Sequence, residues 1–122
     1  MKHILIARAE ENLQAASILF QAGLYNASAN RAYYSAFHAA AAFILANGLN
    51  VEIDYRKVQA LFNTEFINRR KILPAQYKAL LPEMQKVRNN ADYEAEGVSK
   101  TKANEQIRSA TNFLAIIKDK MP

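Results

Sequence analysis

The chain has 122 residues, a length that suits one domain with its own hydrophobic core. It has no cysteine and only two histidines, far apart, which excludes disulfides, thiolate metal sites and any zinc or haem motif. Sixteen lysine and arginine residues against eleven aspartate and glutamate residues give a net charge of +5. Because the basic residues are scattered, this excess favours plain solubility over an acidic partner such as nucleic acid, which it permits without establishing.

No segment predicts export or membrane insertion. The apolar run Ile4–Ala7 is too short for a signal peptide or a membrane-spanning helix, and Glu10 and Glu11 follow it closely. We therefore expect a cytoplasmic protein without a membrane partner. We also expect no metal and no cofactor, because the sequence has no pattern that would hold one.

Few glycines and prolines and abundant alanine predict an all-helical protein. We expect the first helix over about 2–22, ended by Gly23, and the second over about 25–47, ended by Gly48. The first has one regular apolar face, formed by Leu5, Ile6, Ala9, Leu13, Ala16 and Phe20. Asp54 is expected to cap the third helix, whose inward residues are Val58, Leu61, Phe62 and Phe66.

Two prolines mark the start of the fourth helix, and a glycine precedes the fifth. Pro74 should open the fourth helix, and Pro82 inside it should kink or restart it. The inward stripe of this helix is Tyr77, Leu81, Met84, Arg88 and Ala91. Residues 94–98 should form a loop around Gly97, after which Ser99 or Thr101 caps a helix with the stripe Ala103, Ile107, Ala110, Leu114 and Ile117. We expect residues 1–122 to form a single all-α domain, an up-and-down four-helix bundle with an extra short helix.

The first run with possible chemistry is Arg-Ala-Tyr-Tyr-Ser-Ala-Phe-His-Ala-Ala, at residues 31–40. Arg31, Tyr34 and His38 share one face of the second helix, whereas Tyr33 and Phe37 belong to a different face that is typical of core. The simplest interpretation is a polar seam between helices or at a dimer interface, because buried polar groups are usually satisfied. Small residues at 39–42 would let a neighbouring helix approach closely.

The second run is Arg-Asn-Asn-Ala-Asp-Tyr, at residues 88–93. Arg88 falls on the apolar stripe and needs a negative partner, which is either Asp92 one turn later or a bound phosphate. Asn89 and Asn90 add amide groups that suit a base or a ribose. Tyr93 falls where the helix should end, so we expect its hydroxyl to face a cleft.

Together the two runs resemble HEPN domains, small helical bundles named for nucleotide binding in higher eukaryotes and prokaryotes. The resemblance covers essentially the whole chain. It implies a homodimer, and a nucleotidyltransferase-fold partner protein in a toxin–antitoxin-like module. Active members of the family are metal-independent RNases, with an arginine, a polar residue and then a histidine in a motif that is completed across the dimer.

This chain departs from that motif. Arg88 matches the arginine and Asn89 the polar residue, but Tyr93 stands where the histidine is expected. A histidine titrates near neutral pH, whereas an ordinary tyrosine has a pKa of about 10, so a tyrosine in this place is a poor proton acceptor. His38 on another helix is the other candidate. In some family pairs a tyrosine beside the motif receives an AMP group, which makes Tyr93 a candidate acceptor.

Three hypotheses follow. In the first, which the missing histidine favours, a homodimer binds a nucleotide or RNA through a polar set comprising Arg31, Tyr34, His38, Arg88, Asn89 and Asp92. In the second, the same dimer is a metal-independent endoribonuclease with Arg88, His38 and Tyr93 as catalytic residues. In the third, the polar residues satisfy one another and the protein is a structural dimeric scaffold without a ligand.

Overall fold

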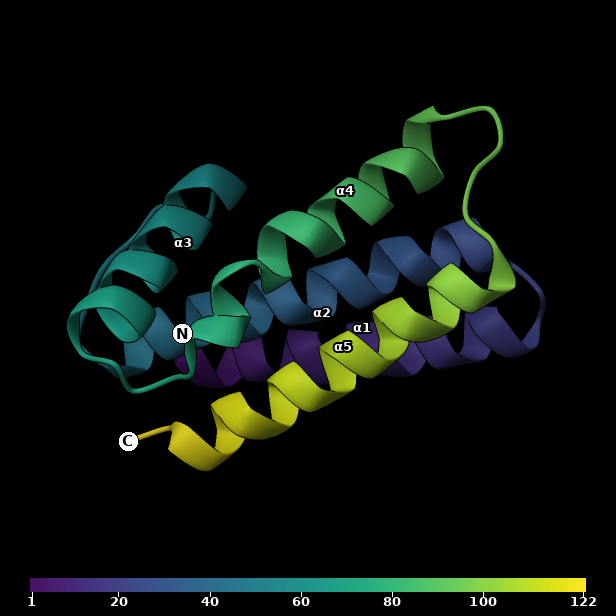
Figure 1. Ribbon diagram of the computed structural model, residues 1–122. Helices are drawn as coiled ribbons and strands as arrows, with labels where there is room; N and C mark the ends of the chain where they lie inside the picture. Colours follow the sequence, from purple (N-terminus) through teal and green to yellow (C-terminus); the bar gives the residue numbers. More distant parts are fainter.

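The computed structural model describes residues 1–122 as an all-helical protein without strands, as the sequence predicts. Its five α-helices are α1 (Lys2–Gln21), α2 (Tyr25–Ala46), α3 (Tyr55–Phe62), α4 (Leu80–Tyr93) and α5 (Lys100–Lys120). Figure 1 shows α1, α2, α4 and α5 running alternately up and down, with α3 at the end that holds both chain termini. Helix α2 is central, because it packs against each of the other four.

Helices α1 and α2 approach closely through small residues. The four alanines at 39–42 are fully buried. Two buried serines of α2 donate hydrogen bonds to backbone carbonyls of α1, Ser28 Oγ to Ala16 O at 2.7 Å and Ser35 Oγ to Ala9 O at 2.8 Å. The donors and the acceptors are each seven residues apart, so the two bonds repeat after two helical turns and fix the antiparallel register. The serine bonds were not predicted.

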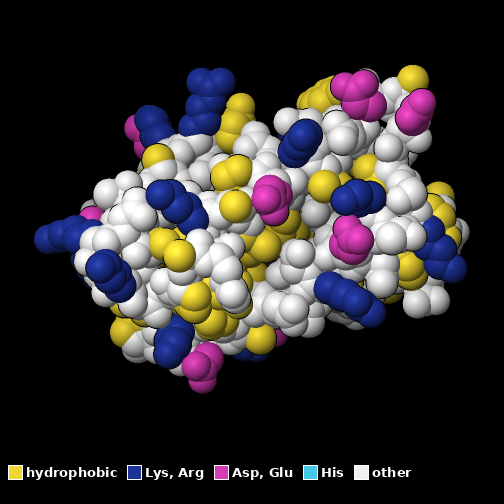
Figure 2. Space-filling view, viewed as in Figure 1, with side chains coloured by type: hydrophobic (Ala, Val, Ile, Leu, Met, Phe, Trp, Pro, Cys, Tyr) yellow, Lys and Arg dark blue, Asp and Glu magenta, His cyan; other side chains and the backbone are white.

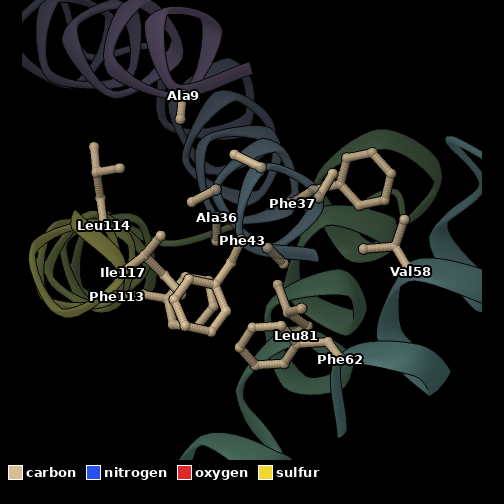
Figure 3. Close-up of a cluster of buried hydrophobic side chains, with 14 of the residues drawn as sticks. Ala9, Ala36, Phe37, Phe43, Val58, Phe62, Leu81, Phe113, Leu114 and Ile117 are labelled. Carbon is tan, nitrogen blue, oxygen red and sulfur yellow. The ribbon is translucent and has the colours of Figure 1, made fainter. Parts of the chain in front are cut away.

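The main core forms where α2, α3, α4 and α5 meet. Figure 3 shows Phe43, Phe62, Phe113 and Leu81 converging from these helices. The ring centres of Phe62 and Phe113 are 5.5 Å apart, in an edge-to-face arrangement that aromatic pairs favour. The inward residues predicted for the third helix are buried, except Leu61, which is half-buried.

The predicted cap of α3 is confirmed. Asp54 Oδ1 accepts from the backbone N–H groups of Arg56 at 3.0 Å and Lys57 at 3.2 Å. Beyond Phe62 the chain continues as a π-helix, η1 (Asn63–Arg69), which the sequence pattern did not predict. In it Glu65 is buried, and it pairs with Arg69 at 2.9 Å and Arg70 at 3.3 Å.

The fourth helix begins later than predicted. Pro74 precedes only a short 3-10 helix, η2 (Ala75–Lys78), and α4 starts afresh at Leu80. Pro82 therefore lies in the first turn of α4, where a missing backbone N–H leaves no helical hydrogen bond unmade. The expected restart at this proline is confirmed.

The loop after α4 is held against the start of α2. Asn26 Oδ1 accepts from Val98 N at 2.7 Å. Gly97 has a φ of +71°, and a β-carbon there would lie 2.6 Å from Asn26 Oδ1. Ser99 caps α5 by accepting from Lys102 N at 3.1 Å, so Ser99 is the cap and Thr101 is not.

Candidate functional site

The candidate site is built around the arginine of α4. The predicted stripe of α4 is buried at Leu81, Met84 and Ala91, and it places Arg88 between them and the surface with 20% of its side chain exposed. A guanidinium in such a half-buried position loses much of its hydration and has to be compensated by partners.

Arg88 finds only partial compensation within the chain. Its Nε lies 3.0 Å from Asp92 Oδ2, which is the predicted i,i+4 ion pair, but the angle does not make a hydrogen bond, and Nε is buried without one. Its Nη1 donates to Asn89 Oδ1 at 3.1 Å, and Nη2 donates no hydrogen bond. Arg88 therefore forms the predicted ion pair and still has N–H groups that donate no hydrogen bond.

Asp92 is shared with a second helix. Its Oδ2 accepts from Asn30 Nδ2 of α2 at 2.9 Å, and Asn30 Oδ1 in turn accepts from Arg31 Nε at 2.9 Å. Arg31 Nη1 also donates to Asn12 Oδ1 of α1 at 3.0 Å. Arg31, a predicted ligand-binding residue, thus donates its hydrogen bonds within the protein, in a polar network that joins α1, α2 and α4.

The two arginines lie beside one aromatic ring. The guanidinium carbons of Arg31 and Arg88 are 5.0 and 5.5 Å from the centre of the Tyr34 ring, within cation–π range. The Arg88 guanidinium is also 5.7 Å from the centre of the Tyr93 ring, and Tyr93 is 73% exposed. Tyr34 is therefore packed against cations, while Tyr93 stands on the surface next to Arg88.

A cavity of about 340 Å³ brings three predicted residues together from two helices. It is lined by Tyr34 and His38 of α2 and by Arg88 of α4, with further walls from the segment at Ile53–Tyr55. Three predicted residues do not line it: Arg31, Asn89 and Asp92. Asn89 and Asp92 contact Arg88 directly, and Arg31 is linked to Asp92 through Asn30. Tyr93 also lies outside it.

His38 has a defined tautomer in this cavity. Its Nδ1 lies 2.7 Å from the backbone carbonyl oxygen of Tyr34, and because that oxygen only accepts, Nδ1 carries the proton. Burial lowers the pKa of His38 below its usual 6.5, the carbonyl hydrogen bond opposes this, and the charges of Arg8 and Arg31 add to the lowering. At neutral pH the imidazole is uncharged, with a lone pair on Nε2.

The cavity also contains polar residues that sequence reasoning missed. Tyr33, predicted as plain core, is 2% exposed, and its hydroxyl accepts from Gln59 Nε2 at 3.2 Å. Gln59 Nε2 also donates to Gln85 Oε1 at 2.8 Å, and Gln85 lines the cavity. Burial raises the pKa of Tyr33 to about 12, so its hydroxyl stays protonated. Isolated glutamines on separate helices carry no sequence signal that would have revealed this cluster.

A larger cavity, of about 590 Å³, lies between α4 and α5. Figure 2 shows hydrophobic side chains in the hollow between these helices, with charged residues of both signs around it. It is lined by Met84, Val87, Asn90 and Gln106 among others, and by no residue of the predicted polar set. Its size does not make it the candidate site, because the groups with phosphate or proton chemistry line the smaller cavity.

Two further findings concern cofactors and membranes. No three histidine, aspartate or glutamate side chains lie close enough together to hold a metal ion. None of the helices combines the length and apolar character needed to cross a membrane.

Comparison with known proteins gives the family. The model of the HEPN domain matches residues 3–120. A protein of Methanocaldococcus jannaschii named "Putative toxin MJ0605" is 36% identical over 114 residues, which cover 93% of this chain and 84% of that protein. The "UPF0332 protein PH1297" of Pyrococcus horikoshii is 44% identical over 70 residues, covering 55% of this chain and 45% of that protein. With two arginines, a histidine and a tyrosine gathered on α2 and α4 of a helical bundle, the chain belongs to the HEPN domain family.

Proposed function

We propose that this HEPN domain binds the phosphate of a ribonucleotide, free or within RNA, through Arg88. The observation that carries the proposal is the state of this guanidinium. It lines an accessible cavity, its Nη2 makes no hydrogen bond, and its Nε has an ion-pair contact without a hydrogen bond. A phosphate offers oxygens in the geometry that the open edge of an arginine recognises.

The charge around the cavity supports an anionic ligand. Arg31 and Arg88 flank Tyr34, while Asp92 is the carboxylate that pairs with them, directly and through Asn30. These three groups together carry one net positive charge, and the carboxylate of Asp54, which also lines the cavity, accepts hydrogen bonds from the backbone N–H groups of Arg56 and Lys57 at the start of α3. Burial is the main cause that lowers the pKa of His38, and the positive charges of Arg8 and Arg31 add to this lowering.

One relative supports a toxin-like role. The chain aligns with 84% of the Methanocaldococcus jannaschii protein named "Putative toxin MJ0605". We therefore propose that this protein is one component of a toxin–antitoxin-like module and acts with a nucleotidyltransferase-fold partner. We also propose a homodimer with Tyr93 at its contact face, because this side chain is an exposed aromatic beside Arg88.

A specific observation favours a second candidate function, metal-independent endoribonuclease activity. His38 lines the same cavity as Arg88, and its Nε2 has a lone pair that accepts no hydrogen bond within the chain. In this reaction Nε2 takes the proton of a ribose 2′-hydroxyl, the 2′-oxygen forms a bond to phosphorus, and the bond to the 5′-oxygen breaks. The leaving oxygen takes a proton from water, the resulting hydroxide takes the proton from the His38 imidazolium, and a 2′,3′-cyclic phosphate remains.

The experiment is binding and cleavage of one fluorescent single-stranded RNA. Binding is followed by anisotropy with the wild type, Arg88→Ala and Arg108→Ala, the last removing an exposed arginine of α5 that does not line the cavity. We expect Arg88→Ala to weaken binding at least about tenfold, since hydrogen bonds to charged groups contribute about 1.5–3 kcal/mol, and Arg108→Ala to leave it nearly unchanged. Equal loss in both variants contradicts the proposal. Cleavage that vanishes in His38→Ala selects the second function.

A further inference from the structure

We infer that the cavity beside Arg88 is a nucleobase subsite, which holds the base of the ribonucleotide whose phosphate Arg88 binds. The inference rests on the proposed function and adds the part of the ligand that the arginine does not contact. Three features of the cavity support it: its size, its free aromatic surface and its polar floor.

The size and walls suit a small, flat ligand. The volume of about 340 Å³ falls at the lower end of the range of about 300–1,000 Å³ typical of small-molecule sites. Arg88 is one of the lining residues, so a nucleotide whose phosphate it binds has the cavity within reach. The remaining walls combine apolar side chains, such as Phe37 and Ile53, with a few polar groups. A nucleobase has apolar faces and a polar edge, so apolar walls can pack on its faces while polar groups form hydrogen bonds with its edge.

The aromatic surface free for stacking belongs to Tyr55. The ring of Tyr34 is packed against two guanidinium groups, and Phe37 is 5% exposed. Tyr55, at the start of α3, lines the cavity and is 42% exposed. Ile53 beside it is 53% exposed. An exposed tyrosine at the cavity is the kind of surface on which bases stack without regard to sequence.

The polar floor has hydrogen-bonding capacity to spare. Tyr33 is 2% exposed and lines the cavity, yet its hydroxyl makes a single hydrogen bond, from Gln59. Gln85 also makes one, likewise from Gln59, although an amide can make four. The buried hydroxyl of Tyr33 and the half-buried amide of Gln85 therefore keep hydrogen-bonding capacity that the edge of a base can use.

The test uses ligands that differ only in the base. Binding of the four ribonucleoside 5′-monophosphates and of ribose 5-phosphate is measured by calorimetry with the wild type. We expect at least one nucleotide to bind at least about fivefold more tightly than ribose 5-phosphate, the lower end of what one stacked base contributes. Tyr55→Ala should remove this difference and leave ribose 5-phosphate unaffected, whereas Tyr55→Phe should keep it.

A second pair of variants tests the floor without a risk to folding. Tyr33→Phe removes only the buried hydroxyl, and its matched control, Tyr77→Phe, removes the hydroxyl of a half-buried tyrosine that packs on Phe113 away from the cavity. We expect Tyr33→Phe to change the order of affinity among the four nucleotides, and Tyr77→Phe to preserve it.

The outcomes separate the two proposals. If the nucleotides and ribose 5-phosphate bind equally, and Arg88→Ala weakens all of them, the base subsite is refuted and phosphate binding stands. If nothing binds to the wild type, the proposed function and the subsite fail together. If the nucleotides bind more tightly but Tyr55→Ala and Tyr33→Phe retain the full preference, the base is held elsewhere and the inference is overturned.

Discussion

Asp92 Oδ2 lies 3.0 Å from Arg88 Nε, one helical turn along α4, in an ion pair that lacks the geometry of a hydrogen bond. The same oxygen accepts a well-formed hydrogen bond from Asn30 Nδ2 at 2.9 Å. The carboxylate is thus aimed at α2, and it balances the charge of Arg88 without occupying the donors of the guanidinium. This contact fits both the structural hypothesis, in which the two residues satisfy each other, and the binding hypothesis. The donors of Arg88 that make no hydrogen bond favour the binding hypothesis.

Neutralising Asp92 should strengthen ligand binding. In Asp92→Asn the negative charge next to Arg88 is removed while the shape is kept, so a phosphate meets less repulsion and binds several-fold more tightly. The two side chains are 20% and 26% exposed, and their ion pair, which makes no hydrogen bond, should cost about 1 kcal/mol when it is lost. Anisotropy with fluorescent RNA and urea denaturation measure the two effects. Binding that weakens tenfold would show instead that Asp92 is required to hold Arg88 in position.

Gly97→Ala should destabilise the fold more than Gly23→Ala. Both glycines have φ values near the left-handed region, +71° and +80°, so the backbone strain of alanine is similar. At Gly97 the new β-carbon also meets the side chain of Asn26 at 2.6 Å and disrupts the hydrogen bond that Asn26 Oδ1 accepts from Val98 N, whereas nothing lies within 4 Å at Gly23. We expect an extra loss of about 1 kcal/mol in the free energy of unfolding, measured in urea. Equal losses would mean that the loop yields freely.

Folding stability should increase with pH around the titration of His38. Burial, opposed by the hydrogen bond to Tyr34 and reinforced by Arg8 and Arg31, lowers its pKa in the folded protein below the unfolded value of about 6.5. Between these two values the unfolded chain binds a proton that the folded protein does not, so stability falls as the pH drops below about 6.5 and recovers above it.

The measurement is urea denaturation at pH 5.5 and pH 7.5, for the wild type and His38→Gln. The difference in the free energy of unfolding between the two pH values should be smaller in the variant, because glutamine does not titrate. An identical pH difference in both proteins would assign the effect to other groups.

Much of the fold could be predicted because it depends on local pattern. Helices α1 and α2 end within about one residue of their expected limits, at Gln21 and Ala46, since glycine and an apolar period define such boundaries. The caps at Asp54 and Ser99 are local chemistry too. The π-helix η1 was not predicted, because the apolar pattern of residues 63–69 fits an α-helix equally well.

The site was predictable only in its outline. An arginine on an apolar stripe signals that Arg88 has a partner, and Asp92 is within reach on the same helix. The partners Asn30 and Asn12 depend on how α1, α2 and α4 cross, which no periodicity reveals. The same is true of the cavity that joins His38 to Arg88. Long-range packing decides such contacts, and sequence spacing describes one helix at a time.

The most direct measurement of the central claim, that Arg88 binds a ribonucleotide phosphate, is a set of melting curves with and without saturating nucleoside monophosphate. Ligand at 100 times its dissociation constant adds about 2.7 kcal/mol of stability, or about 10 °C in Tm for a domain of this size. The wild type and Arg108→Ala should both show this rise. Arg88→Ala should melt near the wild type without ligand, and a tenfold loss of affinity should cut its rise to about half of the wild-type rise or less. A full rise in Arg88→Ala, or a variant that is already unfolded without ligand, would contradict the account.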